Sequence, residues 1–125
     1  MIKFNSDKVK LIHQLIAQET GGSPDLRDEG LLKTSIEGIF QTFEGTELYP
    51  SKEEKGARLG YNLISNHPFV DGNKRIGMHI MIVFLESNGI HIESSNKDVV
   101  EAGLGVASGN IGYEELLEWV KSHKV

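Results

Sequence analysis

The stretch HPFVDGNKRIG, from His67 to Gly77, decides how the rest of the chain is interpreted. It places an imidazole, a carboxylate, a flexible glycine and two adjacent cations in one short loop. The loop leads into the apolar segment Ile76–Leu85, which we expect to form a buried central helix. A helix N-terminus offers unpaired N–H groups and a partial positive charge, and both favour phosphate binding. A histidine just upstream supplies a base, so the stretch indicates phosphoryl or nucleotidyl transfer.

The adjacent cations Lys74 and Arg75 are the strongest indication of a bound anion. Cations in the first turn of a helix oppose its dipole, so a purely structural role does not account for them. Bound phosphate would remove that conflict. Asp71 has two interpretations: it belongs to a turn before Gly72, or its oxygens hold Mg²⁺ beside the phosphate.

Three other loop residues have both a structural and a functional interpretation. His67 either caps the end of the preceding helix, because Pro68 disfavours helical geometry before it, or serves as the base. Gly72 permits a close backbone approach to a ligand. We expect Asn73 to cap the following helix with its side chain while its backbone faces an anion.

The remaining histidines do not form a recognisable site. His79 lies on the same helical face as Arg75, and we expect it to be a hydrogen-bonded core histidine. His13, His91 and His123 lack the spacing of metal ligands and are interpreted as surface or incidental residues. In the first long loop, Arg27 lies in a charged cluster and is within possible reach of the site.

Composition narrows the function classes. The chain has 125 residues and is expected to form a single domain over residues 1–125. Its net charge of −5 argues against direct nucleic-acid binding. The absence of cysteine excludes disulfides and thiolate metal sites. Without a signal-like segment or an apolar run of membrane-spanning length, we expect a soluble, cytoplasmic protein that makes no membrane contact.

Helical signals dominate the rest of the chain, and they predict an all-α fold of about six helices around the buried central one. Asn5 or Ser6, Ser51, and Ser95 or Asn96 are the expected N-caps. Phe43–Pro50 is interpreted as a loop or short flap, and Gly89–Glu93 as a possible strand with no obvious partner. The helices are expected over about 6–20, 29–40, 52–66 and 74–88, then after 95 or 96, and from 113 onward.

These motifs resemble the Fic/Doc family, and in particular its short Doc-type branch. The family motif reads HPFx(D/E)GNxR, and His67–Arg75 matches every defined position. Leu26–Glu37, the segment around Leu48-Tyr49-Pro50, and Val106–Val120 also resemble Doc-type proteins. The resemblance covers nearly the whole chain and implies a compact Fic-type helical bundle.

The resemblance also implies roles for individual residues. His67 would take the proton from a protein hydroxyl, and Asp71 would hold Mg²⁺. Phe43–Ser51 resembles the flap that aligns the target chain in extended form. The implied catalytic residues are His67, Asp71, Lys74 and Arg75. The implied nucleotide-phosphate ligands are Gly72, Asn73, Lys74 and Arg75.

Two departures from the motif bear on the reaction. AMP-transferring Fic enzymes read GNGRxxR, whereas Lys74 replaces the second glycine here and Met78 replaces the second arginine. Doc-type members share the lysine and transfer the γ-phosphate of ATP, so the resemblance implies a protein kinase. The known target of that branch is a threonine of elongation factor Tu, whose modification halts translation.

Two other functions remain open from the sequence: an AMP-transferase, and a catalytically silent partner-binding module. The inhibitory motif (S/T)xxxE(G/N) of the family does not occur in the chain. The resemblance therefore implies a toxin restrained by a separate antitoxin, expected to be a disordered segment that folds over the active-site groove.

Overall fold

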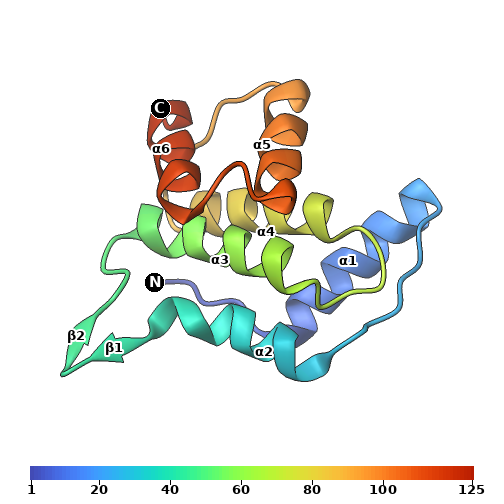
Figure 1. Ribbon diagram of the computed structural model, residues 1–125, viewed down its shortest axis with the longest axis horizontal. Helices are drawn as coiled ribbons and strands as arrows, with labels where there is room; N and C mark the ends of the chain where they lie inside the picture. Colours follow the sequence, from blue (N-terminus) through green and yellow to red (C-terminus); the bar gives the residue numbers. More distant parts are fainter.

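The computed structural model describes residues 1–125 and contains six α-helices, one 3₁₀ turn and one short hairpin (Figure 1). This confirms the expected all-α architecture of about six helices. No helix combines the length and the apolar character needed to cross a membrane. In chain order the elements are α1 (Ser6–Thr20), α2 (Glu29–Glu37), η1 (Gly38–Phe40), β1 (Thr42–Phe43), β2 (Thr46–Glu47), α3 (Lys52–Asn66), α4 (Asn73–Ser87), α5 (Asn96–Ser108) and α6 (Tyr113–His123).

Side-chain caps set where most helices begin, largely as the sequence predicts. Asn5 accepts a hydrogen bond from the third residue of α1, and Ser95 does the same for α5. Ser51 and Glu54 form a reciprocal capping box at the start of α3. Gly21 ends α1 in the left-handed conformation that glycine adopts without steric cost.

Helix α4 is the central element, as expected from its apolar sequence. It packs most extensively against α3, and Figure 1 shows α5 and α6 on one side of this pair and α2 on the other. Glycines permit the close α3–α4 approach: a Cβ at Gly77 would lie 2.5 Å from Cγ1 of Ile64. Gly56 and Gly60 on α3 similarly accept Leu85 and Met81 of α4. Helix α4, which follows the motif loop, is therefore packed closely against α3 along one side.

Two segments differ from the sequence prediction. The second helix ends at Glu37 and tightens into the 3₁₀ turn η1, so it does not run as an α-helix to Phe40. Within the predicted flap, β1 and β2 pair antiparallel around Glu44 and Gly45, which both have positive φ. Such a turn matches the right-handed twist of a two-residue hairpin.

The segment after α4 also has a partner that the sequence did not reveal. Ile92 forms an isolated antiparallel bridge with Lys124, and the Glu93 N–H donates to the His123 carbonyl over 2.8 Å. The C-terminal residues therefore complete the possible strand at Gly89–Glu93. They are too few to make a sheet.

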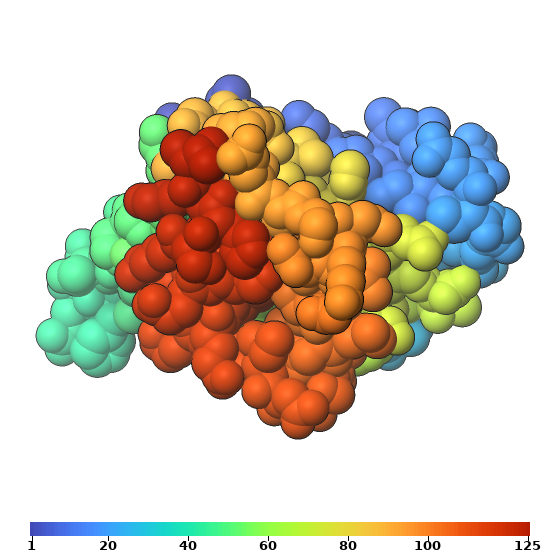
Figure 2. Space-filling view, turned by 90° about the horizontal axis from the view of Figure 1, so that it is seen from above, coloured from blue at the N-terminus to red at the C-terminus, as the bar shows by residue number.

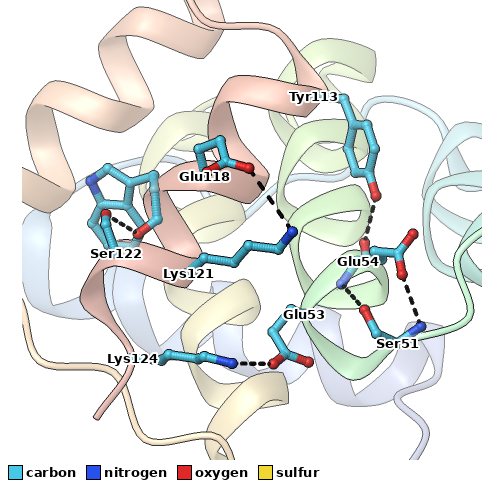
Figure 3. A network of polar contacts seen from close by, with 9 residues as sticks. Ser51, Glu53, Glu54, Tyr113, Glu118, Lys121, Ser122 and Lys124 are labelled. Carbon is cyan, nitrogen blue, oxygen red and sulfur yellow. Dashed lines mark hydrogen bonds and ion pairs between the residues drawn. The ribbon is translucent and has the colours of Figure 1, made fainter.

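Polar contacts join the start of α3 to α6 (Figure 3). Lys124 lies 2.7 Å from the Glu53 carboxylate, and this hydrogen bond lowers the pKa of Glu53. The Tyr113 hydroxyl donates to the Glu54 carbonyl over 3.3 Å. Burial, with the Glu54 carboxylate nearby, raises the pKa of Tyr113 to about 12. These contacts lie at the end of α3 remote from the motif loop (Figure 1).

Candidate active site

The loop between α3 and α4 begins with a histidine in an unusual backbone conformation. His67 closes α3 at φ 49° and ψ 55°, in the left-handed region. This region costs a non-glycine residue roughly 1–2 kcal/mol, so surrounding contacts must hold it. Its Nδ1 lies 3.1 Å from the Ser65 carbonyl oxygen, which can only accept a hydrogen bond. Nδ1 therefore donates, so in the neutral form of this exposed ring Nε2 carries the lone pair. A base in this orientation is available to a ligand.

Asn73 shapes the loop in a way that differs from the predicted helix cap. It is the first residue of α4 and makes no cap hydrogen bond. Instead its buried carboxamide accepts from the Phe69 N–H over 3.0 Å and donates to the Phe69 carbonyl over 2.9 Å. The side chain thus pairs with one residue of the loop as a neighbouring strand would, and it is not available to a nucleotide.

Because the Asn73 side chain binds Phe69, it does not cap α4, and the backbone N–H groups of the first turn stay free. Gly72, at φ 78°, precedes the helix and gives its own N–H to the Asp71 carboxylate over 2.9 Å. The backbone N–H groups of Asn73, Lys74 and Arg75 make no hydrogen bond within the chain. Three donors and the helix dipole therefore meet at one place, which is the arrangement that binds anions.

Lys74 and Arg75 are exposed and take part in no ion pair. This agrees with their predicted role as phosphate ligands but does not test it. Met78, at the position of the second arginine in the AMP-transferring motif, is only 1% exposed and packs in the core. His79 is exposed, so the prediction of a hydrogen-bonded core histidine was wrong.

Asp71 is exposed and free of cation partners within the chain, so its carboxylate can face a bound metal. Nowhere in the chain do three or more acidic or histidine side chains gather as a complete metal cage. A single carboxylate is nevertheless sufficient for Mg²⁺, which keeps several waters and binds the phosphates of its nucleotide. The residues present therefore fit a nucleotide-borne Mg²⁺.

The segment between α1 and α2 holds the loop from outside. Leu26 bridges to Phe69 in antiparallel fashion, and the Val70 N–H donates to the Asp25 carbonyl. The Arg27 guanidinium donates to the carbonyls of Asn66 and His67 over 2.8 and 2.6 Å. Its predicted reach to the site is confirmed. These bonds satisfy the last carbonyls of α3 and hold the strained His67 in place.

A histidine interpreted from sequence as incidental proves to be part of this site. His13, on α1, is 2% exposed, and its Nε2 lies 2.8 Å from the Asp71 carbonyl oxygen. Its ring stacks on Phe69 with 3.7 Å between centroids and 9° between planes. The only advance signal was its position between Val9 and Ala17 at helical spacing, on the buried face of α1.

The hairpin predicted to serve as the flap lies far from these residues. Figure 1 places β1 and β2 at the opposite end of α3 from the loop, and Figure 2 shows the hairpin projecting on the side away from α1. A helix of 15 residues is roughly 22 Å long. Lys55, which is buried, anchors the base of the hairpin through Glu47 and the Tyr49 carbonyl. An extended target chain would therefore have to run along α3 to contact both the hairpin and His67.

Two comparisons show which known proteins the chain resembles. The sequence model of the Fic/DOC family matches residues 3–85, which include α1, the loop and most of α4. A curated relative, the toxin Doc of Mycolicibacterium smegmatis, is 38% identical over 72 residues. That match covers 58% of this chain and 55% of the relative, so the chain spans about half the length of the curated protein it matches.

Proposed function

Because the chain belongs to the Fic/DOC family, we propose that it is the toxin of a toxin–antitoxin pair and acts as a protein kinase. It transfers the γ-phosphate of ATP to a serine or threonine hydroxyl of a translation factor, with elongation factor Tu as the first candidate. The result is inhibition of translation in the cytoplasm. The toxin relative supports the first part of this proposal, and the chemistry of the loop supports the second.

One observation carries the proposal: the free base and the anion site belong to the same loop. His67 has its Nδ1 bonded to the Ser65 carbonyl, which leaves Nε2 for a ligand, and six residues later α4 begins with three unpaired N–H groups and two unpaired cations. We infer that a phosphate held at the helix N-terminus comes within reach of a group able to accept a proton. Phosphoryl transfer needs mainly this combination of positioning and charge stabilisation.

The chemical step follows from these roles. Nε2 of His67 takes the proton of the target hydroxyl while its oxygen forms a bond to the γ-phosphorus of ATP. The bond between that phosphorus and the β,γ-bridging oxygen breaks, and ADP leaves. Lys74, Arg75 and the N–H groups of the first turn stabilise the charge spread over the transferred group. When bound at Asp71, Mg²⁺ neutralises part of the phosphate charge.

Two residues favour γ-phosphoryl transfer over AMP transfer. Lys74 stands where AMP-transferases of the family have glycine, and its side chain adds a cation to the phosphate site. Met78 lies in the core, where it offers no cation to a triphosphate in the other orientation. The antitoxin partner is proposed on the basis of the toxin relative, with the surface around the loop as its binding site.

The test is a labelling assay with purified chain, Mg²⁺ and bacterial elongation factor Tu, run in parallel with γ-labelled and α-labelled ATP. His67→Ala removes the proposed base. His91→Ala is the matched control, because His91 is an exposed histidine whose side chain is hydrogen-bonded only to Glu86.

Label from γ-ATP that disappears in His67→Ala and persists in His91→Ala supports the kinase. Label from α-ATP would replace it with AMP transfer. A third outcome is that neither nucleotide labels elongation factor Tu or any protein of a whole lysate. If growth inhibition also survives His67→Ala, the chain is a catalytically silent binding module.

A further inference from the structure

We propose that His13 is a positioning residue of the active site: its Nε2–H holds the Asp71–Gly72 peptide in the orientation that phosphate and metal binding require. The effect of His13 on catalysis rests on the proposed function, whereas its effect on the loop can be measured without any catalytic assay. His13 comes from α1, more than fifty residues before the loop, and Figure 2 shows the end of α1 beside the loop segment.

The first argument is that packing alone does not explain a histidine at this position. Residue 13 lies on the buried face of α1, between Val9 and Ala17, and its ring stacks on Phe69. A phenyl ring would fill the same space. The imidazole instead brings a buried Nδ1 that has no hydrogen-bond partner. An unpaired buried polar atom is destabilising, so something else must favour the imidazole.

The second argument is the identity of the partner. The Asp71 carbonyl oxygen can only accept, so Nε2 carries the hydrogen and Nδ1 carries the lone pair. The same peptide unit has its Gly72 N–H bound by the Asp71 carboxylate over 2.9 Å. Because a peptide unit is planar, these two bonds hold its plane from both ends.

The orientation of this peptide matters because the ligand groups lie on either side of it. The Asp71 carboxylate precedes it, and the unpaired N–H groups of α4 follow it, beginning at Asn73. His13 also limits the space around the glycine, since a Cβ added at Gly72 would lie 3.6 Å from Nε2. Rotation of the peptide would turn the metal ligand and the anion donors away from each other.

His13→Phe and His13→Gln separate a positioning role from a packing role. Phenylalanine keeps the ring and its stacking but has no donor. Glutamine loses the stacking but places an amide N–H near the former Nε2. A purely structural histidine predicts that His13→Phe is at least as stable and as active as the wild type, because it removes the unpaired atom. A positioning role predicts a stable His13→Phe variant with an impaired loop.

The first readout does not depend on catalysis. In ¹H–¹⁵N spectra, we expect the amides of residues 72–75 to shift or broaden in His13→Phe and to respond weakly to MgADP, with recovery in His13→Gln. In the wild-type protein, a two-bond ¹H–¹⁵N spectrum should show hydrogen on Nε2 and none on Nδ1. Unchanged loop amides in His13→Phe, or a wild-type ring with no hydrogen on Nε2, would overturn the proposal. The tautomer measurement decides the matter if His13→Phe does not fold.

The second readout is the transfer reaction. We expect His13→Phe to lower kcat at least tenfold, to change KM for the protein substrate less than twofold, and to be substantially rescued by His13→Gln. Equal defects in both variants would argue against the hydrogen bond. If the wild-type chain transfers no phosphate, the proposed function fails, whereas the loop amides still decide whether His13 positions the loop.

Discussion

Substitution of Asn73 by alanine is the most direct test of how the loop is built. The carboxamide of Asn73 pairs with both polar groups of Phe69, at 3.0 and 2.9 Å, and all of these atoms are buried. Removing it leaves a buried N–H and a buried C=O without partners. Each unsatisfied group costs about 1–3 kcal/mol, so we expect the free energy of unfolding to fall by roughly 2–6 kcal/mol.

This loss can be converted to a melting temperature. Unfolding entropy is about 2.1 cal/mol/K per residue near 60 °C, so for a chain of 125 residues each kcal/mol corresponds to roughly 4 °C. Asn73→Ala should therefore lower Tm by about 8–23 °C in a calorimetric scan. Asn73→Asp should be comparable or worse, because its carboxylate still accepts from Phe69 N–H but repels the carbonyl.

The other end of α4 provides the matched control. Asn88 is also buried, and it pairs with the N–H and the C=O of Ile2 over 2.7 and 3.1 Å. Asn88→Ala should also lose stability, but less, because Ile2 is half exposed and its freed groups can bind water, and the change lies at a distance from the loop. Transfer activity per folded molecule, measured well below both transitions, should fall at least tenfold in Asn73→Ala and change less than twofold in Asn88→Ala. A Tm loss under 3 °C in Asn73→Ala, or equal activity in the two variants, would refute the reasoning.

Three further predictions concern other contacts. Arg27→Met removes the guanidinium that binds the carbonyls at the end of α3. We expect the free energy of unfolding, measured by urea titration, to fall by about 1–2 kcal/mol, and phosphoryl transfer to weaken as His67 relaxes. Arg27→Lys should be intermediate in both measurements. Gly77→Ala places a Cβ 2.5 Å from Cγ1 of Ile64, so overpacking should cost about 1–3 kcal/mol in the same titration. Tyr113 has its pKa raised from 10 to about 12 in the folded protein. The free energy of unfolding of the wild type should therefore fall between pH 10 and 12 relative to that of Tyr113→Phe. A tyrosinate absorbance change near pH 12 should be seen in the wild type and be missing from Tyr113→Phe.

The sequence predicted the helices better than the directions of their side chains. Caps and apolar spacing located all six helices, because those signals are local. The α4 sequence is apolar on almost every side, so its pattern does not show which narrow stripe faces solvent. For that reason His79 was placed in the core, although it is exposed. Conversely, a single histidine on the inner face of α1 gave no sign that a distant loop would bring it a carbonyl.

The loop shows the same distinction between composition and geometry. The residue types from His67 to Arg75 predicted an anion site, and the free N–H groups agree with that prediction. The role of Asn73 could not be read from its type, because an asparagine before a helix usually caps it. Here Gly72 takes the preceding position with positive φ, which moves Asn73 into the first turn. Only the tertiary path of the loop decides between these two uses.

The geometry of the loop therefore does not belong to the motif alone. The strained His67 is held by Arg27, the Asp71–Gly72 peptide by His13, and the backbone of the loop by pairing with residues 25–28. His13 lies on α1, and residues 25–28 lie in the segment that joins α1 to α2, so the geometry of the site depends on how both dock against the loop. Local opening of α1 would release the Asp71–Gly72 peptide, and with it the orientation of the metal ligand and the anion donors. A ligand that binds only the assembled loop must in turn stabilise the docking of α1. Protection of α1 amides from hydrogen exchange should consequently rise when MgADP binds, although α1 itself supplies no ligand to the nucleotide.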